Sequence, residues 1–331
     1  MSRQVEIWTV RDVLNWTSQK FADLRLPTPL LDAQLLIGSV LSLSKVEIYT
    51  QLDRPLVETE RSALRELVRR RLSGEPVAYL LSQKFWHDLD LYVGSRVLVP
   101  RPETETLLDL VLAVCRHENR QPQRILDICT GSGCLALALA KVFPAAEVIG
   151  IDLSPDALEV ASLNAVRNKI ANVKWVQGDA LNQNLYEDLG GKRFDIVVGN
   201  PPYVSETEWS ECDPSVKQFE PKMALIGGEL GWQFPQRLLQ ALNASGVLSD
   251  STLVGFELGL SHPEILAEEM NASCGFEFVR PMVSLACQRP VWEFPRDQWF
   301  SIKDYSQRSR FLFGVRNSGL KSPESLEQQS L

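Results

Sequence analysis

The spacing of apolar residues divides the chain into a helical N-terminal part and a longer part in which strands alternate with helices. LLDAQLLIGSVL, from Leu30, and TERSALRELVRRRLSG, from Thr59, carry apolar residues at the three- and four-residue spacing of amphipathic helices. We therefore expect a helical domain over residues 1–84. Such a domain is either a small bundle that packs on a larger domain or a platform that recognises a macromolecular partner.

Residues 85–100 alternate apolar and polar side chains around Gly94. This pattern predicts a connecting β-hairpin with strands near 88–93 and 96–99. Pro102 and the acidic residues after it predict the start of a helix, because proline suits the first helical turn and acids favour the positive end of the helix dipole.

From residue 124 onward, short apolar runs alternate with helical patterns, and a helix is expected near 262–270. This alternation predicts an α/β fold with a doubly wound sheet, in a domain over residues 101–317. Residues 318–331 are expected to be a disordered tail. The predicted strands cover 124–128, 147–152, 173–177, 194–199, 253–258, 276–283 and 309–316.

The first of these strands leads into a glycine-rich loop, ICTGSGCLA. Gly131, Gly133 and Ala136 fit the pattern G-x-G-x-x-G/A, in which glycines let the backbone turn tightly and approach a ligand. Asp152 ends the second strand, 21 residues after Gly131, and an acid at this spacing can accept both hydroxyls of a ribose. The pattern indicates a nucleoside-containing cofactor and fits NAD about as well as S-adenosylmethionine.

Gly178-Asp179-Ala180 follows the third strand and sharpens this interpretation. The Asp179 carboxylate can accept the exocyclic amine of adenine, and Ala180 can contribute its backbone N–H. Because ligands bind outside the carboxyl ends of the strands in such sheets, we expect these groups to converge on one pocket.

Asn200-Pro201-Pro202-Tyr203 ends the fourth strand, beside the expected pocket. A conjugated NH₂ group is a poor nucleophile and is barely basic, so catalysis needs positioning and hydrogen-bond acceptors for its two N–H groups. The Asn200 side-chain oxygen and the Pro201 carbonyl can supply these acceptors, and Tyr203 can stack on a planar amide or base. The motif therefore predicts transfer of a methyl group to a planar NH₂.

The chain resembles the HemK/PrmC family, the peptide chain release factor glutamine methyltransferases. The resemblance covers nearly the whole chain. NPPY alone is shared with adenine methyltransferases, and the other segments make the match more specific. These segments are RRRLSGEPVAYLL, FWHDLDLYVGSRVLVPRPETE, DICTGSGCLALALA, VIGIDLSPDALEVASLNA, FDIVVGNPPYVSE and FEPKMALIGGELG.

The resemblance implies a Rossmann-like seven-stranded methyltransferase sheet with a small helical N-terminal domain. It implies methylation, by S-adenosylmethionine, of the glutamine amide in the Gly-Gly-Gln loop of class I release factors, with S-adenosylhomocysteine as the product and no metal. The catalytic and substrate-binding residues would be Asn200, Pro201, Pro202 and Tyr203. The implied cofactor contacts, with Asp179 added from the strand-end argument, are Cys129, Thr130, Gly131, Ser132, Gly133, Asp152, Asp179, Ala180 and Asn200.

Cys129 departs from the family pattern D-x-G-T-G-x-G, which often has glycine at this position. A side chain there is expected to require a negative φ. We interpret Cys129 as a small buried apolar residue without a redox role.

Three other groups of residues lie outside these motifs. Arg101, Glu103 and Glu105 either line a substrate entrance or are ordinary surface charges at a helix start. Phe219-Glu220-Pro221 could order the catalytic loop. Tryptophans 232, 292 and 299 are expected to be packing residues.

Composition and charge limit the cellular compartment and the class of substrate that we expect for this protein. The net charge of −8 disfavours nucleic acid as a direct substrate. The six cysteines form no C-x-x-C, and the chain has neither a secretory signal nor an apolar run of membrane-spanning length, so we expect a cytoplasmic protein. We also expect a monomer. Three alternatives stay open: methylation of a ribosomal protein glutamine, methylation of the exocyclic amine of adenine in nucleic acid, and a binding protein that has lost catalysis.

Overall fold

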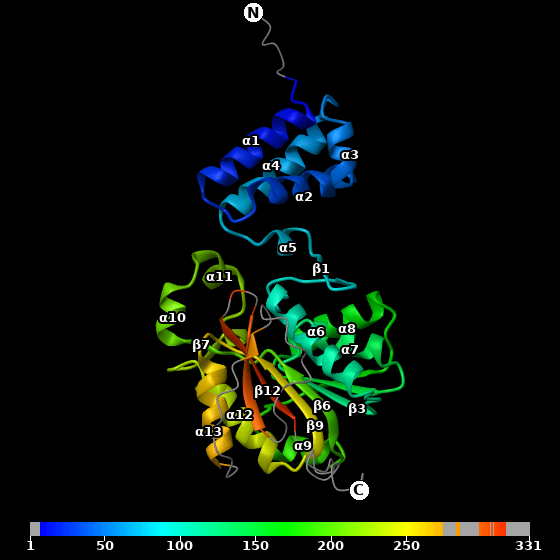
Figure 1. Cartoon of the computed structure of the whole chain (residues 1–331). Coiled ribbons are helices and arrows are strands. Elements are labelled where there is room, and N and C mark those ends of the chain that lie inside the picture. Colours follow the sequence, from blue (N-terminus) through cyan, green and yellow to red (C-terminus); the bar gives the residue numbers. More distant parts are fainter. Residues whose placement is uncertain (1–6, 274–282, 285–297, 305, 307, 316–331) are drawn as a thin grey trace, which may run out of the picture. The chain divides into compact units, whose positions relative to one another are not determined.

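The computed structural model describes residues 7–273, 283–284, 298–304, 306 and 308–315. The chain divides into two compact units (Figure 1), and each is described by itself. The first unit comprises the chain up to Gln83 together with Val93–Ser95 and Asp213–Phe219. The second comprises Lys84–Tyr92, Arg96–Cys212 and the chain from Glu220 onward.

The first unit is helical. Its helices enclose a core that includes Phe21, Leu36 and Ile48. The Thr9 side chain caps the first helix, and a buried ion pair of 2.8 Å joins Arg71 to Asp32. The helices are α1 (Val10–Asp23), α2 (Pro29–Leu41), α3 (Lys45–Thr50), α4 (Glu58–Leu72), α5 (Val77–Leu80) and α11 (Pro214–Phe219).

The second unit contains a mixed sheet in the order β10-β11-β12-β9-β6-β3-β4-β5. Seven of these strands are five residues or longer, and β10 is a two-residue strand at the edge, which agrees with the expected seven-stranded sheet. Strand β12 runs antiparallel to both of its neighbours, whereas β5, β4, β3, β6 and β9 are parallel. The strands are β3 (Arg124–Ile128), β4 (Glu147–Asp152), β5 (Val173–Gln177), β6 (Phe194–Gly199), β9 (Leu248–Glu257), β10 (Val283–Ser284), β11 (Gln298–Lys303) and β12 (Ser309–Val315).

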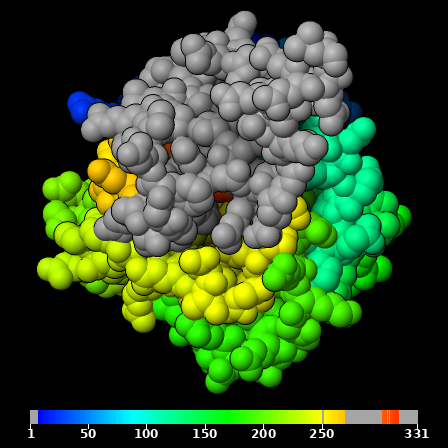
Figure 2. Space-filling model, turned by 60° about the horizontal axis from the view of Figure 1, so that its bottom comes forward, coloured from blue at the N-terminus to red at the C-terminus, as the bar shows by residue number. Residues whose placement is uncertain are grey.

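Helices cover both faces of this sheet (Figure 1). One layer contains α6 (Pro102–His117), α7 (Cys134–Val142) and α8 (Pro155–Arg167), which pack on one another and on the strands. The other contains α9 (Gln183–Asp188), α12 (Gln233–Ala244) and α13 (His262–Ser273), and their apolar residues join a core with the strands. Helices α9 and α12 contact each other. Figure 2 shows a face of the molecule on which green and yellow parts of the chain lie side by side.

The hairpin forms, but the predicted strand positions were wrong. Strands β1 (Lys84–Trp86) and β2 (Leu89–Leu91) pair on either side of the turn at His87 and Asp88. Gly94 is not the turn of this hairpin, and residues 94–99 contain no strand. The turn bends at His87, whose φ is 51°.

The segment between the Asn200–Tyr203 motif and α12 folds back, so that its last part pairs with the residues that follow the motif. Strand β7 (Val204–Ser205) pairs with β8 (Ile226–Gly228), and the Leu225 carbonyl accepts the backbone N–H groups of Tyr203 and Val204. Between them lie the short helix α10 (Glu206–Glu211), helix α11 and the 3-10 turn Lys222–Ala224.

The strands predicted at 124–128, 147–152, 173–177 and 194–199 are confirmed, as is the helix predicted near 262–270, which is α13. The strand predicted at 253–258 begins earlier, at Leu248. The strand predicted over 276–283 lies outside the described residues except for Val283, and so does the tail over 318–331. Strand β11 was not predicted.

Candidate active site

The loop between β3 and α7 has the sharp turns that its glycines predict. Gly131 and Gly133 have φ angles of 55° and 81°. At Gly133 an added Cβ would lie 2.9 Å from the Trp175 ring and 3.1 Å from the Ala161 side chain. Glycine is therefore required at this position both by conformation and by space.

The expectation for the backbone of Cys129 was wrong, because its φ is 57°. A residue with a side chain adopts this left-handed conformation at a cost of about 1 kcal/mol. Cys129 is half-buried and packs on the core, and burial, followed by the charges of Asp152, Asp127 and Asp179, raises the pKa of its thiol. A thiol that stays protonated fits the interpretation of Cys129 as an inert apolar group, although it also lines the pocket described below.

Asp152 joins the ends of two strands. Its Oδ2 accepts the backbone N–H of Gly131 and its Oδ1 accepts that of Ser154, each at 2.9 Å. Burial raises the pKa of this carboxyl, while the hydrogen bonds from Ser154 and Gly131 lower it. A carboxylate has about four acceptor positions, so it can still accept the two hydroxyls of a ribose.

Asp127 is a buried acid that the sequence analysis did not select. Its Oδ2 accepts hydrogen bonds from the Thr130 hydroxyl at 2.5 Å and the Ala136 N–H at 3.1 Å, while its buried Oδ1 has no partner. Burial raises the pKa of this carboxyl to about 7. Its signal in the sequence was a lone acid within the apolar strand RILDI, directly before the glycine loop.

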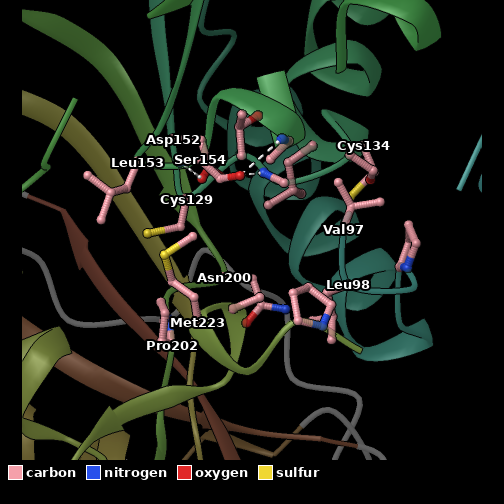
Figure 3. Close-up of a pocket in the computed structure, with 18 of the residues that line it drawn as sticks. Val97, Leu98, Cys129, Cys134, Asp152, Leu153, Ser154, Asn200, Pro202 and Met223 are labelled. Carbon is pink, nitrogen blue, oxygen red and sulfur yellow. Dashed lines mark hydrogen bonds between the residues drawn. The ribbon is translucent and has the colours of Figure 1, made fainter. Parts of the chain in front are cut away.

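These groups lie around one cavity of about 260 Å³ (Figure 3). Its walls include the glycine loop, the end of β4 and Asn200, together with apolar groups such as Met223 and Phe234. The cavity has what an adenosyl cofactor requires: an acid for the ribose, glycines that admit a ligand close to the backbone, and apolar walls. An unpartnered buried oxygen on Asp127 adds an acceptor for a positively charged group.

Asn200 is the first residue of the Asn200–Tyr203 motif, and it lines this cavity (Figure 3). Its side-chain NH₂ donates to the Thr104 hydroxyl at 3.3 Å, and that hydroxyl donates to Glu257 Oε2 at 2.6 Å. The Tyr203 hydroxyl donates to the other oxygen of Glu257 at 3.4 Å. Burial raises the pKa of the Glu257 carboxyl to about 7, although the Thr104 hydrogen bond and the Arg310 charge lower it.

The structure brings some of the predicted residues together and leaves others apart from the cavity lining. Asn200, Pro202, Asp152 and residues 129–132 line the cavity. Asp179 is exposed and its carboxylate accepts the backbone N–H of Leu181, while the Ala180 carbonyl accepts the Tyr186 hydroxyl. Asp179, Ala180, Gly133, Pro201 and Tyr203 are not among the lining residues, and the roles of all the predicted site residues toward ligands stay predictions.

Glu220 follows α11, and its side chain is hydrogen-bonded to two residues that precede α6. Its buried carboxylate accepts from the Arg101 guanidinium at 2.6 Å and from the Val99 N–H at 3.3 Å. Arg101 also lines the cavity, and Glu105 accepts the His87 N–H. These contacts fit the interpretation that Glu220 orders this part of the site.

Trp232 packs on the core, as expected of a packing residue. The side chains of tryptophans 292 and 299 lie outside the described part of the chain.

Comparison with known proteins assigns the chain to a family. Residues 12–81 match the PrmC N-terminal domain, and residues 120–226 match a methyltransferase domain. The release factor glutamine methyltransferase of Chlorobaculum tepidum is 38% identical over 251 residues, which cover 73% of this chain and 85% of that protein. The chain belongs to the release factor glutamine methyltransferase family.

Other relatives agree with this membership. The release factor glutamine methyltransferases of Geobacter sulfurreducens and Rhodopirellula baltica are each 38% identical, over 75% and 73% of this chain and 85% and 82% of theirs. The chain is therefore an S-adenosylmethionine-dependent methyltransferase. A solved structure of the hMettl16 catalytic domain with an RNA hairpin is 15% identical, with a TM-score of 0.48 over 71% of this chain and 77% of that one.

In the described residues, no helix is both long and apolar enough to span a membrane. Nor does the described part of the chain gather three or more histidine, cysteine or acidic side chains as a metal site would.

Proposed function

We propose that this enzyme transfers the methyl group of S-adenosylmethionine to the side-chain amide nitrogen of the glutamine in the Gly-Gly-Gln motif of class I peptide chain release factors. One observation carries the proposal: Asn200, whose amide is held by Thr104, and Asp152, which suits a ribose, line the same cavity. This arrangement would hold the NH₂ group of a substrate amide beside a nucleoside cofactor.

When bound, S-adenosylmethionine supplies an electrophilic methyl group on a positively charged sulfur. Asp152 and residues 129–133 would hold the nucleoside part, and Asp179 and Ala180 would contact adenine. These are the groups that the carboxyl ends of β3, β4 and β5 present.

Asn200 Oδ1 and the Pro201 carbonyl accept the two N–H groups of the substrate amide. They hold its nitrogen in place and stabilise the positive charge that develops on it as the new bond to carbon forms. One amide proton then passes to solvent. Tyr203 packs against the flat face of the amide.

We also propose that the helical domain recognises the protein substrate and that the enzyme acts as a cytoplasmic monomer without a metal. The match of residues 12–81 to a domain of this family supports the first part. The net charge of −8 and the absence of C-x-x-C support a protein substrate and a reducing compartment.

The experiment offers the purified enzyme and methyl-labelled S-adenosylmethionine to three acceptors: a release factor, the same factor with its Gly-Gly-Gln glutamine changed to alanine, and adenine-containing DNA. Label on the intact factor alone is expected. Label on DNA would instead establish an adenine methyltransferase. No label on any of the three would overturn the release factor as substrate and make ribosomal protein the next acceptor to test.

A further inference from the structure

The Glu257 carboxylate lies between the two ends of the catalytic motif. It is the last residue of β9, beside the end of β6 from which Asn200 follows. One oxygen accepts the Thr104 hydroxyl at 2.6 Å and the other accepts the Tyr203 hydroxyl at 3.4 Å. Glu257 and Thr104 are 1% and 2% exposed, so water does not compete for these bonds.

While the Glu257 carboxyl is ionised, the hydrogen count at Thr104 fixes the orientation of the Asn200 amide. A threonine hydroxyl has one hydrogen, and Thr104 gives it to Glu257 Oε2. Toward Asn200 the same oxygen can only accept, so it takes the amide NH₂ at 3.3 Å. The reversed amide would place Asn200 Oδ1 against an oxygen lone pair.

This orientation decides what Asn200 offers to a substrate. With its NH₂ held by Thr104, Oδ1 is free to accept an N–H. The reversed amide would present donors to a substrate NH₂, which itself has only N–H groups to give. A single rotation of the amide would therefore convert an acceptor site into a repulsive one.

We propose that Thr104 and Glu257 are positioning residues that hold Asn200 Oδ1 toward the substrate amide, with Glu257 also holding Tyr203. This inference rests on the proposed function, because it concerns how the same site receives an NH₂ group. Neither residue needs to touch the substrate. The pair links α6 and β9 to the loop after β6, so three elements far apart in sequence fix one side chain.

Thr104→Val and Thr104→Ser form the matched test. Valine has nearly the shape of threonine but no hydroxyl, whereas serine keeps the hydroxyl. We expect Thr104→Val to lower kcat about tenfold or more, and Thr104→Ser to stay within about threefold of wild type. The Kd for S-adenosylmethionine, measured by calorimetry, should change less than about threefold in either variant.

The same substitution in an Asn200→Ala background separates positioning from general damage. If Thr104 acts through Asn200, Thr104→Val should cause no further loss of turnover in Asn200→Ala. Losses that multiply, a serine variant as impaired as valine, or an unaffected valine variant would each overturn the inference. If Thr104→Val does not fold, Thr104→Ala is measured in the same cycle.

Wild-type enzyme with the release factor is the control that keeps the two proposals apart. No transfer by wild type would overturn the proposed function. Normal transfer by wild type together with full activity of Thr104→Val would overturn the positioning role alone.

Discussion

Asp152 Oδ2 accepts the backbone N–H of Gly131 at 2.9 Å, so the acid at the end of β4 holds the glycine turn that follows β3. The carboxylate thus shapes the loop and also faces the cavity. Both features suit the cofactor site that we propose, and neither involves the groups that we propose for the substrate amide.

Asp152→Ala should therefore act first on cofactor affinity. Loss of hydrogen bonds to a charged group costs about 1.5–3 kcal/mol, which corresponds to a Kd for S-adenosylmethionine raised about tenfold or more. Calorimetric titration gives the Kd, and turnover at saturating cofactor shows whether kcat is largely kept. A large fall in kcat with unchanged Kd would show that Asp152 does not bind the cofactor.

Cys129 provides a second test, because its φ of 57° is accessible to glycine at little cost. We expect Cys129→Gly to keep its affinity for S-adenosylmethionine. Cys129→Val should weaken that affinity and lower the free energy of unfolding by about 1–2 kcal/mol, because a β-branched residue is strained there. Titration and chemical denaturation measure the two effects. Equal behaviour of the two variants would contradict the role of the loop conformation.

Gly227 lets β8 approach the catalytic motif closely. An added Cβ would lie 2.1 Å from the Gly231 carbonyl oxygen, 2.5 Å from the Pro202 carbonyl oxygen and 2.7 Å from the Tyr203 Cα, and all three are backbone atoms. Gly227→Ala should shift the motif and lower kcat about 100-fold.

Gly190→Ala is the control for this substitution. Gly190 has a φ of 89° and nothing within 4 Å of an added Cβ, so alanine should cost stability without moving the motif. If both variants lost turnover to the same degree, the contact with Pro202 and Tyr203 would not be the cause.

Glu257 predicts a pH dependence of stability. Its pKa is raised by burial from 4.5 to about 7, so the folded protein binds this proton more tightly than the unfolded chain does. Its contribution to the free energy of unfolding is complete below about pH 4.5 and is lost as the pH rises through about 7. Denaturation of wild type and Glu257→Gln across this range should show wild type losing stability relative to the variant. A pH-independent difference would contradict the shift.

The parallel strands and the glycine loop could be predicted because their signals are local. RILDI and FDIVVG are largely buried and are therefore mainly apolar in sequence. The position of the hairpin was predicted wrongly. The turn was expected at Gly94, whereas His87 and Asp88 form it. Glycine marks a possible turn, but the register of two three-residue strands is decided by packing.

The site shows the same division between local and tertiary signals. Asn200 and Asp152 stand at strand ends, where the Asn-Pro-Pro-Tyr motif marks the first and the spacing from Gly131 marks the second. Thr104 was passed over in favour of its neighbours Glu103 and Glu105, because its role depends on Asn200 and Glu257, which are 96 and 153 residues away along the chain. No spacing rule connects positions so far apart.

The central claim is that Asn200 serves the substrate amide rather than the cofactor. The most direct measurement is kcat for Asn200→Ala on a release factor, together with the Kd of the variant for S-adenosylmethionine. Loss of a preorganised polar contact that acts mainly in the transition state predicts a fall in kcat of about 100-fold or more, with a smaller change in Kd. Equal losses in kcat and cofactor affinity would show that Asn200 is chiefly a cofactor ligand and would contradict the account.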